Sequence, residues 1–272
     1  MIKFLRISST WALSINTIIF TFVPETIFGK YKLIILASSE ANIIIIRVLA
    51  FAAVFVLSVI INALFLHCRR SIHIKGNNYN IHIKYGDLFK MRTCKKVIAF
   101  DECFTTSVGT SPADIKPNSI CGQYLDKYPI QDMQNLIDNA QLKPAQSKSK
   151  YQNKVRYDSG KLVPNGDNLL LAFAQLDKDG LGEFSSRDEF IDCLSMLWKE
   201  IDKYYGQKDV CIPVLGSGLT RIGDTSPTQQ ELLDIIIASY KLSIRKIKSP
   251  CKLHIVCKKH DDFSLNKIGE SM

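Results

Sequence analysis

The sequence predicts an α/β domain with a largely parallel or mixed central sheet, preceded by two apolar segments. Three observations support this. Residues 169–174 (LLLAFA) and 209–215 (DVCIPVL) are apolar runs of the kind found in strands buried on both faces. Residues 187–205 repeat apolar side chains at three- and four-residue spacing, as an amphipathic helix does. Residues 1–70 contain two long uncharged stretches, whereas the remainder has the mixed composition of a globular domain.

The first 70 residues are expected to form a hairpin of two transmembrane helices, over about 7–24 and 43–66. Residues 48–66 carry no charge, and about 20 apolar residues span the hydrocarbon core of a bilayer. Residues 7–23 are shorter and more polar, so a signal peptide with Lys3 and Arg6 as its basic region is the alternative. No A-x-A-like cleavage site is present and a second span follows soon after, which favours a first transmembrane helix.

Basic residues beside the two apolar stretches predict their orientation. Two cations precede the first stretch, and Arg69 and Arg70 follow the second. Short flanks rich in Lys and Arg stay cytoplasmic, so both chain ends are expected in the cytosol, although Lys30 and Lys32 between the spans weaken this pattern. The eight cysteines form no CxxC pair, and the chain is neither small nor rich in cysteine as disulfide scaffolds are, so reduced thiols in a cytosolic domain are expected. A multi-pass protein of the cytoplasmic membrane is therefore expected.

The net charge of +9 does not predict nucleic-acid binding. Residues 1–70 contain seven Lys or Arg and two Asp or Glu, so 7 − 2 = +5 of the excess flanks the apolar stretches. No Lys- and Arg-rich face with interleaved aromatic residues stands out in the remainder. We therefore expect no nucleic-acid partner.

Residues 71–272 are expected to form one cytosolic domain of alternating strands and helices. The first two strands, within 71–76 and 80–86, alternate apolar and polar residues around the turn GNNYN. Later strands are expected at 96–101, 169–174, 209–215 and 252–257, and helices at 118–141, broken at Pro129, and at 187–205. Ser186 or Ser185 would cap the helix at 187–205, and Ser226 would cap a helix with Pro227 first and Gln229 closing a capping box.

The stretch CIPVLGSGLTRIG, residues 211–223, has the pattern of a phosphate-binding loop. It contains no Gly-Lys-Ser/Thr, and a G-x-G-x-x-G fingerprint would need glycine where Arg221 stands. Gly216, Gly218 and Gly223 remain, at the carboxyl end of a buried strand, where ligands bind in open α/β sheets. Successive backbone N–H groups in such a turn form an anion-binding concavity. Taken alone, these glycines also fit a plain turn.

No metal site is expected. Residues 177–189 half-match a calcium loop, but position five is Leu181 and position twelve is Asp188 instead of a bidentate Glu. A polar turn between a strand and a helix is the preferred interpretation. The histidines and cysteines lack zinc-ligand spacing, and Cys103 has no nearby His to activate it as a nucleophile.

A second motif, YGDLFK at 85–90, places Asp87 just after an early strand. Together with KVIAF, LLLAFA…DEFIDCLSMLWKEI and IPVLGSGLTRIG, in this order, it resembles the macrodomain family over roughly residues 71–262. Macrodomains bind ADP-ribose and related molecules at the strand ends. The resemblance implies that Asp87 faces the adenine, that the glycine loop wraps the diphosphate and distal ribose, and that Phe263 stacks on a ring. The implied ligand-binding residues are Asp87, Leu88, Gly216, Ser217, Gly218, Leu219, Thr220, Arg221 and Ile222.

The sequence departs from hydrolytic macrodomains after the third strand. Those enzymes carry an NAAN-like segment, whereas residues 100–109 read FDECFTTSVG. Asp101 and Glu102 lie nearby without reproducing that arrangement. We therefore expect a ligand-binding effector without a cofactor. The alternative is a membrane-tethered hydrolase of ADP-ribose conjugates, in which Asp101 or Glu102 positions water.

Two apolar spans followed by a divergent macrodomain resemble the membrane-bound effector family of Thoeris antiphage defence. This resemblance implies an ADP-ribose-derived signal, made by a TIR-domain partner, that the macrodomain recognises. It also implies that the spans damage the bilayer once the signal is bound. Since two spans alone cannot enclose a pore, a homo-oligomer is expected on activation.

Overall fold

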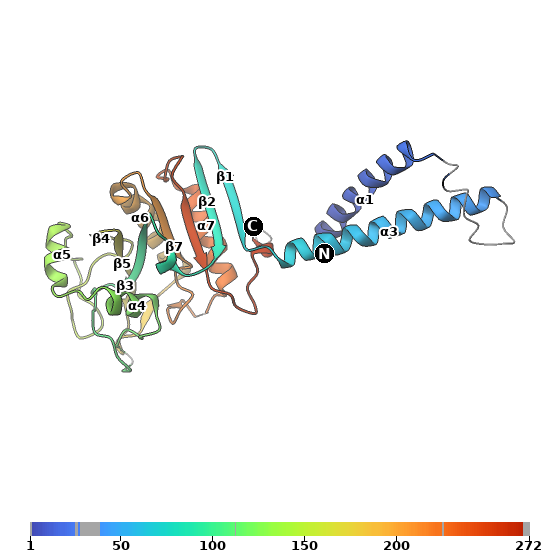
Figure 1. Ribbon diagram of the computed structural model, residues 1–272. Coiled ribbons are helices and arrows are strands. Elements are labelled where there is room, and N and C mark those ends of the chain that lie inside the picture. The colour runs from blue at the N-terminus through green and yellow to red at the C-terminus, as the bar shows by residue number, and fades with distance from the viewer. Residues whose placement is uncertain (1, 25–26, 28–38, 112, 225, 269–272) are drawn as a thin grey trace. The chain divides into compact units, whose positions relative to one another are not determined.

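The structure is a computed structural model that describes residues 2–24, 27, 39–111, 113–224 and 226–268 (Figure 1). The chain divides into two compact units, Met1–Arg69 and Arg70–Met272. Each unit has its own architecture, and each is described separately below.

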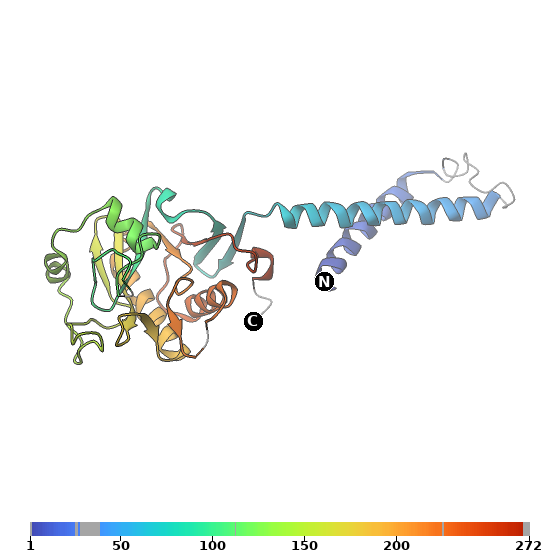
Figure 2. The same ribbon diagram turned by 90° about the horizontal axis from the view of Figure 1, so that it is seen from below.

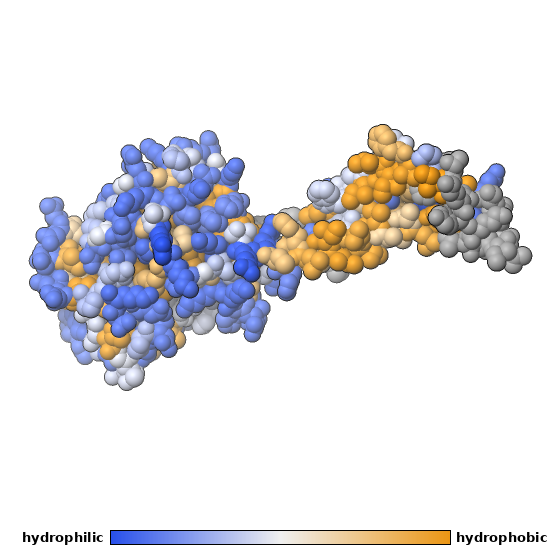
Figure 3. All heavy atoms as spheres, in the orientation of Figure 1, coloured by the Kyte–Doolittle hydropathy of each residue, from blue (hydrophilic) through white to orange (hydrophobic). Residues whose placement is uncertain are grey.

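Over the described residues of the first unit, the helices α1 (Ile2–Phe22) and α3 (Ser39–His67) pack against one another. Figure 3 shows hydrophobic side chains over much of their surface. Among the described residues, one helix is long and apolar enough to cross a membrane, over Glu40–His67 with a mean hydropathy of 2.9. This helix coincides with the second predicted span. The first predicted span, 7–24, falls mostly on α1, which does not meet the same criterion, so the two-span hairpin is not confirmed.

The polar side chains of α1 explain why it is less apolar than α3, and many of them donate hydrogen bonds within the helix. Seven of them donate to the carbonyl four residues earlier: Ser8, Ser9, Thr10, Ser14, Asn16, Thr17 and Thr21. Asn62 Nδ2 of α3 also donates to Ser8 Oγ across the pair, at 3.0 Å. Such bonds reduce the cost of placing hydroxyl and amide groups in apolar surroundings.

The second unit is built on a mixed sheet in the order β1-β2-β9-β7-β3-β5-β6-β8, with β4 paired to β5. Five neighbouring strands, β2, β9, β7, β3 and β5, run parallel, while β1, β4 and β6 each pair antiparallel to a neighbour. The strands are β1 Ser71–Gly76, β2 Tyr79–Tyr85, β3 Cys94–Asp101, β4 Leu162–Asn165, β5 Asn168–Leu176, β6 Gly182–Phe184, β7 Asp209–Pro213, β8 Arg221–Ile222 and β9 Leu253–Cys257. The expected α/β fold with a largely parallel, mixed sheet is confirmed.

Helices cover both faces of this sheet. Alternate residues of β5 enter different apolar clusters: Leu169 and Leu171 pack with α6 and α7, whereas Leu170 and Ala172 pack with α4 and α5. Figure 2 shows α4 and α7 on opposite sides of the strands. The helices are α4 Ile120–Lys127, α5 Met133–Asn139, α6 Arg187–Tyr204 and α7 Gln229–Leu242, with the short 3-10 turns η1 Leu88–Lys90 and η2 Leu265–Lys267.

Most predicted elements are found where the sequence placed them. Ser186 caps α6 by accepting from the Glu189 N–H, and the helical region 118–141 breaks between α4 and α5, around Pro129. The predicted cap of α7 is wrong. Thr228, not Ser226, caps this helix and forms a capping box with Glu231, because its hydroxyl and the Glu231 carboxylate satisfy each other's backbone N–H groups.

Candidate functional site

The parallel strands end together at one edge of the sheet, where the predicted motifs meet. Tyr85 at the end of β2 is in register with Cys257 at the end of β9, and Pro213 of β7 is in register with Val256. Gly86 then donates its N–H to the Cys257 carbonyl at 3.1 Å. This edge therefore carries the turn after β2, the glycine loop after β7 and the loop after β3, as expected for a ligand site in an open α/β sheet.

Asp87 and Leu88 have different environments. Asp87 is exposed and caps η1, with Oδ1 accepting from the Phe89 N–H at 2.8 Å. Within the described residues no hydrogen bond involves its Oδ2, which leaves an acceptor at the sheet edge. Leu88 is 4% exposed and belongs to the core cluster beside α4. Its side chain anchors the turn that presents Asp87.

The glycine loop after β7 exposes a series of backbone donors. Gly216 has φ +82°, a region that favours glycine, and Ser217 folds back so that its Oγ donates to the Val214 carbonyl at 2.7 Å. The N–H groups of Gly216, Gly218, Leu219 and Thr220 form no hydrogen bond with any other part of the chain that is described. Unpaired N–H groups in consecutive loop residues are the chemistry of an anion-binding nest.

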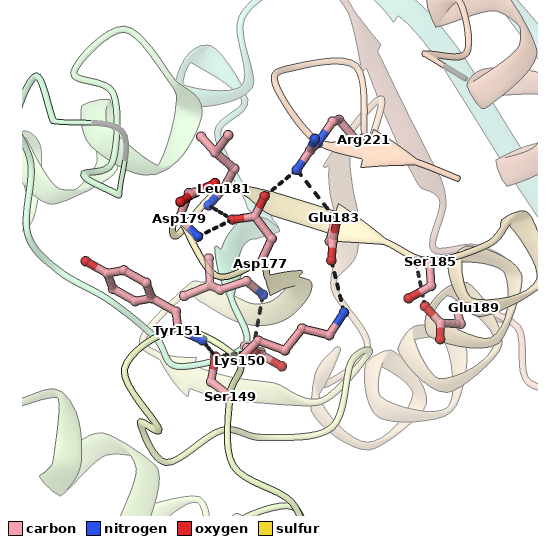
Figure 4. A network of polar contacts seen from close by, with 12 residues as sticks. Ser149, Lys150, Tyr151, Asp177, Asp179, Leu181, Glu183, Ser185, Glu189 and Arg221 are labelled. Carbon is pink, nitrogen blue, oxygen red and sulfur yellow. Dashed lines mark hydrogen bonds and ion pairs between the residues drawn. The ribbon is translucent and has the colours of Figure 1, made fainter. Parts of the chain in front are cut away.

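The last two loop residues belong to strand β8, which pairs with β6. Ile222 is 1% exposed and packs in the core, so its side chain anchors the end of the loop. The Arg221 guanidinium is ion-paired with Asp177 and, at 3.6 Å, with Glu183 (Figure 4). Lys150 Nζ also binds Glu183, at 3.1 Å. Arg221 thus ties the glycine loop to the β5–β6 turn.

The half-matched calcium loop is held by its own turn. Asp177 Oδ1 accepts from the N–H groups of Asp179 and Leu181 at 2.9 and 2.8 Å, and its Oδ2 pairs with Arg221. Figure 4 shows this carboxylate directed at those donors. Over the described residues, no group of three or more His, Cys, Asp or Glu is arranged to hold a metal ion. The contacts of Asp177 are therefore those of a residue that closes a polar turn and pairs with Arg221.

The two carboxylates after β3 fold the neighbouring loops. Asp101 Oδ1 accepts from the N–H groups of Cys103 and Thr105, at 2.8 and 3.1 Å, and burial raises the pKa of this carboxyl. Glu102 is 1% exposed. Its Oε1 accepts from Ser149 Oγ at 2.6 Å, and its Oε2 is 3.1 Å from Arg156 Nη1.

Leu176 at the end of β5 also donates its N–H to Glu102 Oε1, at 3.1 Å. Glu102 therefore joins three chain segments. A carboxylate with this many donors is held rigidly as an acceptor, which is a structural use of the charge.

The structure also places Phe263 and Cys103, two residues considered in the sequence analysis. Phe263 is 6% exposed and meets Tyr85 edge-to-face, with ring centroids 5.7 Å apart, so its ring is part of the core. Burial and the neighbouring Asp101 raise the pKa of Cys103 to about 11, so its thiol is protonated at neutral pH and is a poor nucleophile.

The sequence reasoning missed the ion pairs that hold the glycine loop. Arg221 and Asp177 are 44 residues apart, and Lys150 and Glu183 are 33 apart. No local spacing could reveal them. Only the parallel pairing of β6 with β8 brings Arg221 beside Glu183.

Known proteins resemble this chain in both sequence and structure. A family model described as Thoeris protein ThsA, Macro domain, matches residues 81–258. Thoeris protein ThsA of Bacillus amyloliquefaciens (strain Y2) is 30% identical over 265 residues, covering 94% of this chain and 86% of that protein. Two solved structures are more distant. The Oceanobacillus iheyensis macrodomain with ADP shares 11% identity over 70% of this chain and 89% of that chain, with a TM-score of 0.47. Thermosipho africanus DarTG in complex with ADP-ribose shares 13% identity over 76% of this chain and 48% of that chain, with a TM-score of 0.40.

Proposed function

Because this chain belongs to the family of Thoeris ThsA proteins with a Macro domain, we propose that it is a sensor-effector of antiphage defence. Its macrodomain binds an ADP-ribose-derived nucleotide made by a TIR-domain partner. The binding residues are those at the sheet edge: Asp87 beside the adenine, and the loop from Gly216 to Ile222 around the diphosphate and distal ribose.

One observation carries this proposal. The glycine loop leaves four backbone N–H groups without a partner among the described residues, directly after the central strand β7. A diphosphate offers several anionic acceptors to such donors, and an exposed Asp87 Oδ2 can accept from an exocyclic amino group. Arg221 supports the site by holding the end of the loop through Asp177 and Glu183.

The same proposal assigns a membrane role to residues 1–69. The helix α3 has the length and composition of a span, and seven polar side chains of α1 donate hydrogen bonds within the helix, which lowers the cost of a second span. Ligand binding acts on these helices by favouring an assembled, membrane-damaging state that binds the nucleotide more tightly than the resting state does. This assembly is a homo-oligomer in the cytoplasmic membrane, with the macrodomain in the cytosol.

The proposed activity is recognition without turnover. Asp101 and Glu102, which a hydrolase would need to position water, both accept hydrogen bonds that fold the surrounding loops. Both oxygens of Glu102 are engaged, so releasing this carboxylate to a substrate water would break its contacts, and a water at Asp101 Oδ1 would compete with two backbone donors. The function therefore assigned to them is structural.

The test is calorimetric titration of the full chain, in a neutral detergent, with ADP-ribose and with the products of a TIR enzyme. Mass spectrometry of the same samples reports whether the ligand is intact. We expect saturable binding of at least one nucleotide and recovery of unchanged ligand. Binding followed by cleavage of the nucleotide would support the hydrolase alternative. No binding of any nucleotide would overturn the sensor role.

A further inference from the structure

A row of histidines crosses the sheet on the face opposite the α6–α7 core. His73 of β1 is in register with His82 of β2, and His82 is in register with His254 of β9. The residues beside them, Ile81, Ile83, Leu253 and Ile255, point into the core, so the histidines share the other face. The strands β1 and β2 end the sheet on this side (Figure 1).

These imidazoles are ordered by one another and by a single carboxylate. The rings of His73 and His82 stack with centroids 4.0 Å apart and planes 13° from parallel. His82 Nδ1 lies 3.2 Å from His254 Nδ1, and His254 Nε2 lies 2.8 Å from Asp209 Oδ2. Since a carboxylate only accepts, the proton is on His254 Nε2. When both rings are neutral, His254 Nδ1 accepts from His82 Nδ1, and the lone pair of His82 remains on Nε2.

The carboxylate that orders the row is fully engaged in hydrogen bonds. Asp209 Oδ1 accepts from the Lys252 backbone N–H at 2.9 Å, and its Oδ2 is engaged by His254, so both oxygens are used. Three lysines lie on the same face: Lys75, Lys84 and Lys252. Considering the described residues, none of the three has a carboxylate within 4.0 Å of its ammonium group. The face therefore carries three lysine charges against the single carboxylate of Asp209, an excess of positive charge.

A cavity of about 450 Å³ opens at this place. It is lined by His73, Lys75, Asn80, His82, Ser249 and Lys252, among others. Two ammonium groups, two imidazoles, an amide and a hydroxyl supply both charge and hydrogen bonds to an anion. Lys252 precedes β9 and Asn80 is near the start of β2, so the cavity is at the amino ends of these two strands, whereas Asp87 follows the carboxyl end of β2.

We propose that this cavity is a second anion site, separate from the nucleotide site, that binds a phosphate monoester. Lysine ammonium groups bind phosphate oxygens as point charges, and an imidazole beside them donates or accepts as the phosphate requires. The volume exceeds that of a bare phosphate and accommodates a small attached group. The monoester belongs either to a soluble metabolite or to a lipid headgroup.

The electrostatics of His82 provide a readout. Burial, the neighbouring His73 and His254, and the cations Lys84 and Lys252 lower the pKa of His82 to about 4. Asp209 on β7 is the acidic group at the end of the row. An anion bound in the cavity opposes the effect of these cations, so saturation with phosphate raises the pKa of His82.

The experiment uses the full chain with ¹³C-labelled histidine rings, in neutral detergent at constant ionic strength. Inorganic phosphate is the first probe. We expect saturable shifts of the His73, His82 and His254 signals, unchanged His67 and His260 signals, and an increased pKa of His82. Lys75→Ala/Lys252→Ala should weaken binding at least tenfold. The control Lys199→Ala/Lys241→Ala removes two exposed lysines from α6 and α7 and should bind as wild type does.

A second arm places the chain in phosphatidylcholine nanodiscs with or without phosphatidic acid. If inorganic phosphate shifts the three histidine signals, a soluble phosphate is sufficient to occupy the site. Shifts produced only by phosphatidic acid assign the site to a lipid headgroup. If neither probe shifts the three signals selectively, or if the Lys75→Ala/Lys252→Ala variant binds both as tightly as wild type, the proposal is overturned. Unchanged nucleotide binding by this variant separates the outcome from that of the nucleotide site.

Discussion

At the scale of single residues, Gly216 and Gly218 of the glycine loop have different roles. Gly216 has φ +82°, and a Cβ there would lie 3.3 Å from Ile222 Cδ1 and 3.4 Å from Leu232 Cδ2. Gly218 has no positive φ, and a Cβ there would meet nothing within 4 Å. The first glycine is required by the backbone, whereas the second leaves space beside the exposed N–H donors. Substitutions at the two positions should therefore have different effects.

Gly216→Ala should lower the free energy of unfolding by about 1–2 kcal/mol, the cost of a left-handed conformation for an L-residue, and should weaken nucleotide binding. Gly166→Ala is the matched control, because Gly166 also has positive φ, +61°, with open space around it and a position in the β4–β5 turn. It should lose similar stability and keep full binding. Thermal unfolding and calorimetry measure both quantities. Equal binding by both variants would contradict the role of the loop.

Gly218→Ala should leave stability within about 0.5 kcal/mol of wild type, as expected for an exposed substitution. It should reduce nucleotide affinity, because the new methyl group occupies the space in which a diphosphate would approach the Gly218 and Leu219 N–H groups. Titration with ADP-ribose tests this. Wild-type affinity would show that the ligand does not approach the loop from this side.

Glu102→Gln should destabilise the domain by roughly 1–3 kcal/mol, the range for losing a buried charged hydrogen-bond acceptor. The amide cannot accept equally from Ser149, Arg156 and the Leu176 N–H. Asp126→Asn, at an exposed carboxylate on α4, should change stability little. Mass spectrometry of bound nucleotide should show no change in turnover with either variant. If the wild type forms a product and Glu102→Gln does not, at unchanged stability, the hydrolase alternative is supported.

At the scale of elements, the strength of the local signal decided which predictions succeeded. The α6 helix was predictable because its apolar stripe, including Phe190, Leu194 and Trp198, repeats at helical spacing and packs in the core. The α7 cap was not, since Ser226 and Thr228 both precede the helix and both have a partner three residues on. The reciprocal bonds of Thr228 with Glu231 decide the outcome. The pairing of β6 with β8 joins distant residues and leaves no local pattern.

Thr228→Ala should destabilise the domain by about 1 kcal/mol, while Ser226→Ala should have little effect. The difference should depend on pH. The Thr228 backbone N–H and its hydroxyl lower the pKa of Glu231, so the carboxylate contributes stability above its unfolded pKa of about 4.3 and loses it as pH falls through the lowered folded value. Chemical unfolding at pH 7 and below pH 4 tests both statements. A larger loss of stability with Ser226→Ala than with Thr228→Ala would show that Ser226 caps α7.

At the scale of the whole molecule, composition predicted more than sequence motifs did. The contrast between an apolar segment and an α/β segment is visible in the sequence, and the fold class of the second segment followed from it. The position of the candidate site at the strand ends followed from the strand order and the glycines. The histidine row did not, because His73, His82 and His254 meet only through the pairing of β1, β2 and β9.

The proposal assigns membrane attachment to the first unit and nucleotide binding to the second. It therefore predicts that a substitution can abolish attachment without affecting binding. Leu57 is 56% exposed in the middle of α3, so an arginine there would face lipid. Leu57→Arg should oppose insertion by about 2.5–3.5 kcal/mol, the cost of a cation at the centre of a spanning helix, whereas Leu57→Ala should insert normally. Because the second unit contains both of its apolar clusters between residues 81 and 265, nucleotide affinity should stay within about twofold of wild type.

Carbonate extraction of membranes measures attachment, and calorimetry of the detergent-purified variants measures binding. We expect Leu57→Arg in the soluble or aggregated fraction before purification, and Leu57→Ala in the membrane pellet. If Leu57→Arg resists extraction, α3 does not anchor the chain. If it loses nucleotide binding with an intact second unit, the site depends on the helices, and the ligand acts on an assembly of both units instead of on a separate sensor.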